Sequence, residues 1–371
     1  MRRSMILATA AVMASGLLLA GCGSDDTPSG TDTESGGGGS TPKVGVILPD
    51  TKSSARWETA DAKYLKEAFE AAGVDYDIQN AQGDKTQFQT IADQMITSGV
   101  NVLMIVNLDS GSGKAVLQKA QAQGIATIDY DRLTLGGGAD FYVSFDNVKV
   151  GQLQGEGLEQ CLTDAGKTTA NIVYLNGSPT DNNATLFNEG AVEALSTKVD
   201  GGEFTVVADQ AVPDWDNQQA GTIFEQMWTE NGGKIDGVLA ANDGLGNAAI
   251  AILKKNGVNG TVPVTGQDAT DQGLQNILAG DQCMTVYKAV KKEADAASAL
   301  AVALAKGEDT ADLATGEVED TESGEMVSAV LLDPQSITFD TVKDVIADGY
   351  TTKENVCTAE LEAKCAEAGI S

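Results

Sequence analysis

The chain has 371 residues, of which 54 are acidic and 24 basic, and its formal net charge is −30 at pH 7. A protein of that charge does not bind nucleic acid through its overall electrostatic field. The chain contains no histidine, so Ser-His-Asp and Cys-His catalysis and histidine-ligated transition metals are excluded, and we predict no metal site and no cofactor.

The first 21 residues have the organisation of an export signal. Arg2 and Arg3 precede a short apolar run that ends at Leu19, which is too short for a membrane-spanning helix and has the flanks of a signal peptide. The sequence Leu-Ala-Gly-Cys at 19–22 resembles the bacterial lipobox. We therefore expect residues 1–21 to be a lipoprotein signal peptide, and Cys22 to be the lipidated N-terminus of a protein anchored to the outer face of the cytoplasmic membrane. An ordinary signal peptide followed by a chance cysteine is the alternative.

Residues 22–41 contain no large apolar side chain and are rich in Gly, Ser, Thr and Asp. Such a segment cannot bury enough surface to offset its chain entropy, so we predict a flexible linker. The ordered chain begins near Pro42 and is long enough for two domains.

From Lys43 onward, short Val- and Ile-rich runs alternate with amphipathic stretches, the pattern of parallel strands buried on both faces and connected by helices. In the first half we predict strands at 44–48, 74–78, 102–106 and 125–128, with helices at 57–72, 87–98 and 114–123. In the second half we predict strands at 172–175, 205–208, 237–240 and 262–265, with helices at 186–195, 217–231 and 247–256. Two such series predict an α/β protein with two doubly wound parallel-sheet lobes. Residues 141–147 and 285–288 are predicted to cross between the lobes.

Four cysteines remain beyond Cys22, namely Cys161, Cys283, Cys357 and Cys365. An even number in an oxidising compartment favours two disulfides, with three possible connectivities. Cys357 and Cys365 can pair only if the chain bends between them, because on a straight helix their Cα atoms would lie about 12 Å apart. Four buried thiols are the alternative.

Polar residues and two tryptophans follow the predicted strands in both halves, at the carboxyl ends where open α/β sheets bind ligands. They are Arg56, Trp57, Asp131, Arg132, Asn182, Asn183, Trp215, Asn242 and Asp268, with Lys288 at the second crossing. A sugar requires such a set, because carboxylates accept hydrogen bonds from its hydroxyls while amides, ammonium and guanidinium groups donate to them. Tryptophan rings provide flat surfaces for its C–H faces.

Each of these residue types also has a structural explanation. Asparagine after a strand is commonly a helix N-cap or a turn residue, the charged residues could be solvated, and Trp57 could belong to a helix core. The placement of the whole set at strand ends favours a site.

Several motifs of the chain, and the order in which they occur, resemble those of the sugar-binding proteins of bacterial ABC importers, in the branch that binds xylose or several monosaccharides. The motifs are TKSSARW (51–57), YDR (130–132), FDN (145–147), GSPTDNNA (177–184), GQDA (266–269) and TVYK (285–288). The resemblance implies that the strand-end residues named above contact a monosaccharide, with Trp215 the weakest transfer because it lies in a variable loop.

The same resemblance implies a periplasmic binding protein type 1 fold with a three-crossing hinge. It places residues 42–145 and 286–328 in an N-terminal lobe, and residues 146–285 and 329–371 in a C-terminal lobe. It further implies a monomer that closes on its sugar and delivers it to an ABC permease and its ATPase, so we predict no catalytic residues and no membrane contact beyond the lipid anchor.

Two other functions remain open at the level of sequence. Residues 244–249 fit the dinucleotide motif G-x-G-x-x-A, with Asp268 about 20 residues further on, and Asp131 with Asp268 could form the carboxylate pair of a sugar enzyme. The expected Arg, Lys or amide neighbours would hold both carboxylates ionised, which does not suit acid catalysis. A sensory module that hands its closed form to a receptor or sensor kinase would have the same ligand site as a transport protein.

Overall fold

The computed structural model describes residues 41–371, which form one compact unit. The expected signal peptide, Cys22 and all but the last residue of the expected linker lie outside the described residues. Within residues 41–371, no helix is long and apolar enough to cross a membrane.

The first sheet contains seven strands. They are β1 (Lys43–Leu48), β2 (Asp75–Asn80), β3 (Val102–Ile105), β4 (Ala126–Tyr130), β5 (Phe141–Phe145), β10 (Gly316–Asp320) and β11 (Glu325–Leu332). Their order is β10-β11-β5-β4-β3-β1-β2. Every neighbouring pair is parallel except β10 and β11, so the predicted parallel α/β architecture is confirmed for this half of the fold.

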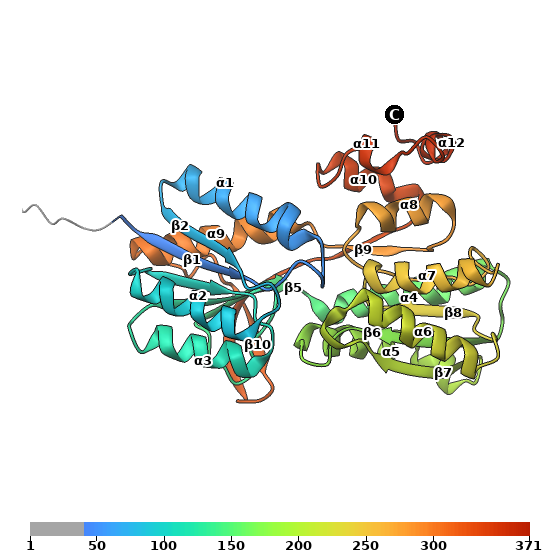
Figure 1. Cartoon of the computed structure of the whole chain (residues 1–371), viewed down its shortest axis with the longest axis horizontal. Coiled ribbons are helices and arrows are strands. Elements are labelled where there is room, and N and C mark those ends of the chain that lie inside the picture. Colours follow the sequence, from blue (N-terminus) through green and yellow to red (C-terminus); the bar gives the residue numbers. More distant parts are fainter. Residues whose placement is uncertain (1–40) are drawn as a thin grey trace, which may run out of the picture. The chain divides into compact units, whose positions relative to one another are not determined.

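Helices cover both faces of this sheet (Figure 1). They are α1 (Ala62–Ala72), α2 (Lys85–Thr97), α3 (Ser110–Gln121) and α9 (Val290–Lys306). Successive residues of β1 point to opposite faces, so Val46 packs in the core under α1 and α9, and Ile47 packs in the core under α2 and α3. A π-helical turn over Trp57–Asp61 leads into α1.

The second sheet contains β6 (Ala170–Asn176), β7 (Phe204–Ala211) and β8 (Gly237–Ala240), which are parallel and lie in the order β7-β6-β8. The strand predicted at 262–265 is reduced to a single bridge between Val238 and Val264. The carbonyl of Pro263 accepts from the Val238 amide at 2.9 Å, but proline has no N–H with which to extend a ladder.

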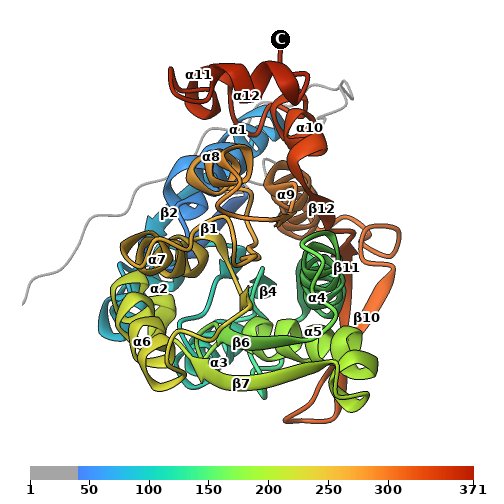
Figure 2. The same ribbon diagram turned by 90° about the vertical axis from the view of Figure 1, so that its right-hand side faces the viewer.

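Four further helices pack on this sheet: α4 (Asn147–Asp164), α5 (Asn182–Asp200), α6 (Asn217–Glu230) and α7 (Asp243–Lys255). Helices α4 and α5 pack against each other on one face, and α6 and α7 do so on the other (Figure 2). The first pair approaches closely at Gly151, where a Cβ would lie 1.9 Å from the carbonyl oxygen of Phe187. Any larger residue at this position would push the two helices apart.

The segments predicted to cross between the lobes have different structures. Strand β5 ends at Phe145 between β4 and β11, and Asp146 caps α4 by accepting a hydrogen bond from the Lys149 amide. The second crossing is β9 (Thr285–Tyr287), which is antiparallel to β12 (Gln335–Ile337). Strand β11 pairs with β5 as far as Leu332 and Phe145, and so extends past residue 328, where the lobe boundary is expected.

The C-terminal segment forms a small helical cluster around α8 (Asp271–Ala279), with α10 (Val342–Ala347), α11 (Lys353–Val356) and α12 (Glu362–Glu367). A disulfide joins Cys357 and Cys365 with their Cα atoms 6.0 Å apart, because the chain bends between α11 and α12. A second disulfide joins Cys161 of α4 to Cys283, which lies just before β9.

Candidate ligand-binding site

Side chains that follow strands of both sheets line one cavity. Nine of the ten residues selected from the sequence are among them: Arg56, Trp57, Asp131, Arg132, Asn183, Trp215, Asn242, Asp268 and Lys288. All nine are buried. Their convergence follows from the fold, because the carboxyl ends of parallel strands meet at one edge of a sheet.

The tenth residue, Asn182, does not line this cavity. Asn182 and Asn183 are the first two residues of α5, and successive residues of a helix point about 100° apart. The Asn183 Nδ2 atom donates to the backbone oxygen of Asp131 at 3.0 Å and to its Oδ1 atom at 3.2 Å. The structure therefore selects Asn183 from the Asp-Asn-Asn run.

Asp131 lies at the centre of the charged groups. Its Oδ2 atom is 2.9 Å from Arg56 Nη1 and 3.2 Å from Lys288 Nζ. Burial by itself would raise the pKa of Asp131, but the charges of Lys288, Arg56 and Arg132 outweigh burial and hold this pKa below its usual range. Asp131 is therefore ionised at neutral pH and accepts hydrogen bonds.

Arg56 contacts two further acidic side chains that the sequence did not indicate. Its guanidinium contacts Asp61 at 2.7 Å and Glu293 at 2.5 Å, and the Tyr130 hydroxyl donates to Asp61 at 2.6 Å. Asp61 lies five residues after Arg56, where a helical turn brings the two together, but Glu293 is 237 residues away in the sequence. Only the packing of α9 beside α1 shows that Glu293 belongs to this network.

The two site tryptophans are fixed by hydrogen bonds from their indole nitrogens. Trp57 Nε1 donates to Ser53 Oγ at 3.1 Å, and Trp215 Nε1 donates to Asp181 Oδ2 at 3.0 Å. The Arg56 guanidinium lies 4.4 Å from the centre of the Trp57 ring. The indole N–H of each tryptophan therefore has a hydrogen-bond partner within the protein, and this contact fixes the position of the ring.

Three of the cavity residues have backbone conformations that are rare for residues other than glycine. The φ angles are 62° at Asp131, 54° at Trp215 and 98° at Asp268. Left-handed conformations of such residues are costly and concentrate at functional sites, where the surrounding structure holds them. This observation is independent of side-chain chemistry and favours the same location.

Direct hydrogen bonds join groups from the two halves of the cavity. Ser54 Oγ donates to Asp268 Oδ2 at 2.9 Å, and Asn242 Nδ2 donates to the Ser53 carbonyl at 3.1 Å. The enclosed volume is about 30 Å³, which is roughly the volume of one water molecule. A ligand of sugar size therefore has to replace these hydrogen bonds with its own.

Asn242 has both roles that the sequence left open. It is the N-cap of α7, where its Oδ1 atom accepts from the Leu245 amide at 2.9 Å, and its side chain also lines the cavity. Further lining residues not selected from the sequence are Ser53, Ser54, Asp181, Phe187 and Gln267. Most of these lie one or two positions from a selected residue, so proximity to the strand end was the available signal.

The structure does not favour a dinucleotide at residues 244–249. The amides at the start of α7 already have partners, since Asp243 N donates to the Gln267 carbonyl and Gly246 N to that of Asn242. Asp243 is also fully buried at this helix N-terminus, where it accepts hydrogen bonds from the side chains of Thr270, Gln282 and Thr285, so the protein's own groups occupy this helix end. Among residues 41–371, no cluster of His, Cys, Asp or Glu could hold a metal ion.

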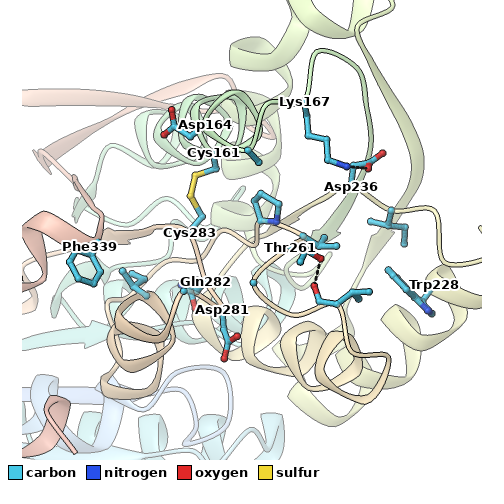
Figure 3. A pocket seen from close by; sticks show the side chains of 18 of the residues that line it. Cys161, Asp164, Lys167, Trp228, Asp236, Thr261, Asp281, Gln282, Cys283 and Phe339 are labelled. Carbon is cyan, nitrogen blue, oxygen red and sulfur yellow. Dashed lines mark hydrogen bonds and ion pairs between the residues drawn. A yellow bond between two sulfur atoms is a disulfide. The ribbon is translucent and has the colours of Figure 1, made fainter. Parts of the chain in front are cut away.

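The Cys161–Cys283 disulfide forms part of the wall of a larger cavity of about 720 Å³ (Figure 3). None of the residues selected for ligand binding lines it. Its charged side chains include Lys167, which is paired with Asp236 at 2.7 Å, and Asp281, which is paired with Lys254 at 2.7 Å. Because these charges are already neutralised by each other, this cavity is a weaker candidate than the one at the strand ends.

The chain is similar in sequence to the proteins of one known family. The sequence model of the family described as periplasmic binding protein domain matches residues 44–309. The D-xylose-binding periplasmic protein of Haemophilus influenzae is 35% identical over 315 residues, covering 85% of this chain and 92% of that protein. The D-xylose-binding periplasmic protein of Escherichia coli is 36% identical over 311 residues, covering 83% and 90% respectively.

The fold is also similar to that of a solved structure. The solute-binding protein of a carbohydrate transporter from Chloroflexus aurantiacus, in complex with D-glucose, superimposes with a TM-score of 0.76 at 28% identity. The match covers 85% of this chain and 98% of that one.

Proposed function

Because the chain belongs to the periplasmic binding protein family, we propose that it binds a monosaccharide at the cavity between its two sheets. Xylose or a related aldopentose or aldohexose is the ligand, and the protein delivers it to the permease of an ABC transporter and its ATPase. The proteins of this family bind substrates and are not enzymes, and we assign no catalytic residue here.

The observation that carries this proposal is the convergence of two tryptophans with hydrogen-bonding groups of both kinds. Asp131 and Asp268 accept hydrogen bonds, while Arg56, Asn183 and Lys288 donate them. A pyranose or furanose presents hydroxyls that need both. Trp57 and Trp215 supply the aromatic surfaces against which its C–H faces stack.

The charge balance of the cavity favours a neutral sugar. Counted from the sequence, three basic residues face two acidic ones, which leaves room for a uronic acid. In the structure, Arg132 is paired with Asp181 at 2.9 Å, and Arg56 is paired with Asp61 as well as Asp131. The positive excess is thereby compensated by the protein, so an uncharged aldose is the better ligand.

We further propose that the protein is exported, acts as a monomer and is tethered to the outer face of the cytoplasmic membrane through a lipid on Cys22. The support is the lipobox-like sequence at 19–22 and the Gly- and Ser-rich segment after it. The tether would keep the binding protein close to its permease in the membrane.

A thermal-shift screen of the purified protein tests the ligand. The panel contains xylose, arabinose, ribose, glucose, galactose, fucose, glucuronate and NAD. A ligand that binds only the folded state raises the melting temperature in line with RT ln(1 + [L]/Kd). A rise with one or two neutral aldoses supports the proposal and identifies the sugar. No rise with any sugar contradicts it, and a rise with NAD alone would favour an enzyme.

A further inference from the structure

Resting on the proposed function, we propose that the sugar site continues into a second subsite, which binds the second unit of a neutral disaccharide. This subsite lies between residues 52–64 and residues 349–355 of the C-terminal segment. The protein would then take up short glycosides as well as free monosaccharides.

The subsite is a cavity of about 580 Å³ directly beside the central one. The two cavities share five of their lining residues, which are Ser53, Ser54, Arg56, Asn242 and Asp268. The second volume falls within the range of about 300–1,000 Å³ that is common for small-molecule sites. A ligand can extend from one cavity to the other where it displaces the hydrogen bonds that lie between them.

Two polar contacts lie where the cavities meet. They are the hydrogen bond from Ser54 Oγ to Asp268 Oδ2 and the one from Asn242 Nδ2 to the Ser53 carbonyl. A sugar hydroxyl that donates to Asp268 takes the place of Ser54. We expect a substituent on a neighbouring carbon of that sugar to enter the larger cavity.

The lining of the larger cavity has the chemistry of a carbohydrate site. Its uncharged polar residues include Thr59, Asn217, Asn247, Gln272, Thr352 and Asn355. Its charged residues are Lys52, Arg56 and Lys63 together with Asp268 and Asp271, and Arg56 is already paired with Asp61 and Asp131. Hydroxyl and amide groups in this number match an uncharged ligand that is rich in hydroxyls.

Tyr350 provides an aromatic surface in this cavity. Its ring lies 5.3 Å from that of Tyr287, whose hydroxyl donates to Asp348 Oδ2 at 2.7 Å. The nearby Cys357–Cys365 disulfide closes the same C-terminal segment. Burial, followed by the charge of Asp268, raises the pKa of the Tyr350 hydroxyl, and both residues line this cavity.

The C-terminal segment lies beyond residues 44–309, which the sequence model of the family matches. A smaller cavity of about 160 Å³ also adjoins the central one, and Arg132, Asp181 and Trp215 line both. Its size makes it a poorer place for a second sugar unit, and it provides the control.

The test is calorimetric titration of the full chain with matched pairs of ligands: xylose and xylobiose, glucose and cellobiose, and glucose and maltose. Tyr350→Ala and Asn355→Ala alter the proposed subsite, and Gln82→Ala alters the smaller cavity. Melting temperatures measured beside each titration show that every variant is folded. Asn355 is exposed, so its truncation keeps the test valid if Tyr350→Ala fails to fold.

We expect at least one disaccharide to bind as tightly as its monosaccharide or more tightly. Tyr350→Ala and Asn355→Ala should each lower the affinity for that disaccharide at least tenfold and change the affinity for the monosaccharide less than threefold. Gln82→Ala should change neither affinity. Tight monosaccharide binding with every disaccharide more than 100-fold weaker overturns the subsite alone. Disaccharide binding that both subsite variants leave unchanged also overturns it. Failure of every sugar to bind contradicts the proposed function itself.

Discussion

The side-chain amide of Asn183 donates to both the backbone oxygen and the carboxylate of Asp131, at 3.0 and 3.2 Å. Asp131 directly follows β4 of the first sheet, and Asn183 is the second residue of α5, which packs on the second sheet. One amide therefore connects the most highly charged point of the cavity to the other half of the fold.

Asn183→Ala removes this connection and one donor from the cavity. Because it leaves buried acceptors of Asp131 without their partner, we expect a loss of about 1–3 kcal/mol in sugar binding. Titration of the sugar identified by the thermal screen measures the effect. Asn182→Ala is the matched control, since the neighbouring residue does not line the cavity. Equal losses in the two variants would show that the assignment of Asn183 is wrong.

Trp57→Ala removes a stacking surface from the sugar. Truncation of a buried aromatic residue at the centre of a binding site costs about 2–4 kcal/mol, so we expect affinity to fall at least 30-fold. Trp228→Ala serves as the control, because Trp228 lines only the distant cavity around Cys161 and Cys283. If Trp57→Ala binds sugar as the parent does, Trp57 is a core residue and not a ligand contact.

Gly177 leaves room for the ring of Trp215. A Cβ at position 177 would lie 2.1 Å from a ring carbon of Trp215, so Gly177→Ala must displace the ring or the loop that carries it. We expect weaker sugar binding and altered tryptophan fluorescence, with a modest loss of thermal stability. Gly221→Ala, on α6, meets no atom within 4 Å and should bind sugar normally. Unchanged binding by Gly177→Ala would remove Trp215 from the site.

Glu293 should make stability depend on pH. Burial raises the pKa of Glu293, and the charge of Arg56 offsets this only in part. The folded protein therefore binds this proton more tightly than the unfolded chain. The resulting stabilisation is complete below the usual carboxyl pKa and is lost as pH rises through the raised pKa.

The measurement is the melting temperature between pH 4 and pH 9. We expect the melting temperature of Glu293→Gln to fall less steeply with rising pH than that of the parent. The melting temperature of Glu189→Gln, at an exposed position, should follow that of the parent. Burial also raises the pKa of Asp129 and that of Asp243 to about 7. These two groups likewise make stability fall as the pH rises, so the melting temperature of Glu293→Gln still falls with pH. Parallel curves for Glu293→Gln and the parent would contradict the raised pKa.

Cys22→Ser should abolish lipidation. In cells fed a labelled fatty acid, we expect the parent to carry the label and to sediment with membranes. The variant should be unlabelled and should no longer sediment with membranes. The other four cysteines are paired in disulfides, so a label retained by Cys22→Ser would show that Cys22 is not the lipid attachment site.

The sequence predicted the strand ends well because buried parallel strands leave a continuous apolar run that stops where the polar residues begin. Arg56, Trp57, Asp131 and Asp268 could be selected on that basis alone. The choice between Asn182 and Asn183 could not be made, because it depends on the direction in which the first turn of α5 faces. Glu293 was not selected, since nothing near it in the sequence marks a partner of Arg56.

The sequence by itself determined the α/β class, most of the strands and helices between residues 43 and 256, and the polar residues at strand ends, because hydrophobic periodicity and local turn chemistry are encoded over a few neighbouring residues. Only the tertiary structure decided the pairing of Cys161 with Cys283, the acidic side chains behind Arg56 and the second cavity that shares Asp268 with the central one. These are contacts between residues distant in the chain, and they depend on how helices and sheets pack against one another. No local pattern records that packing.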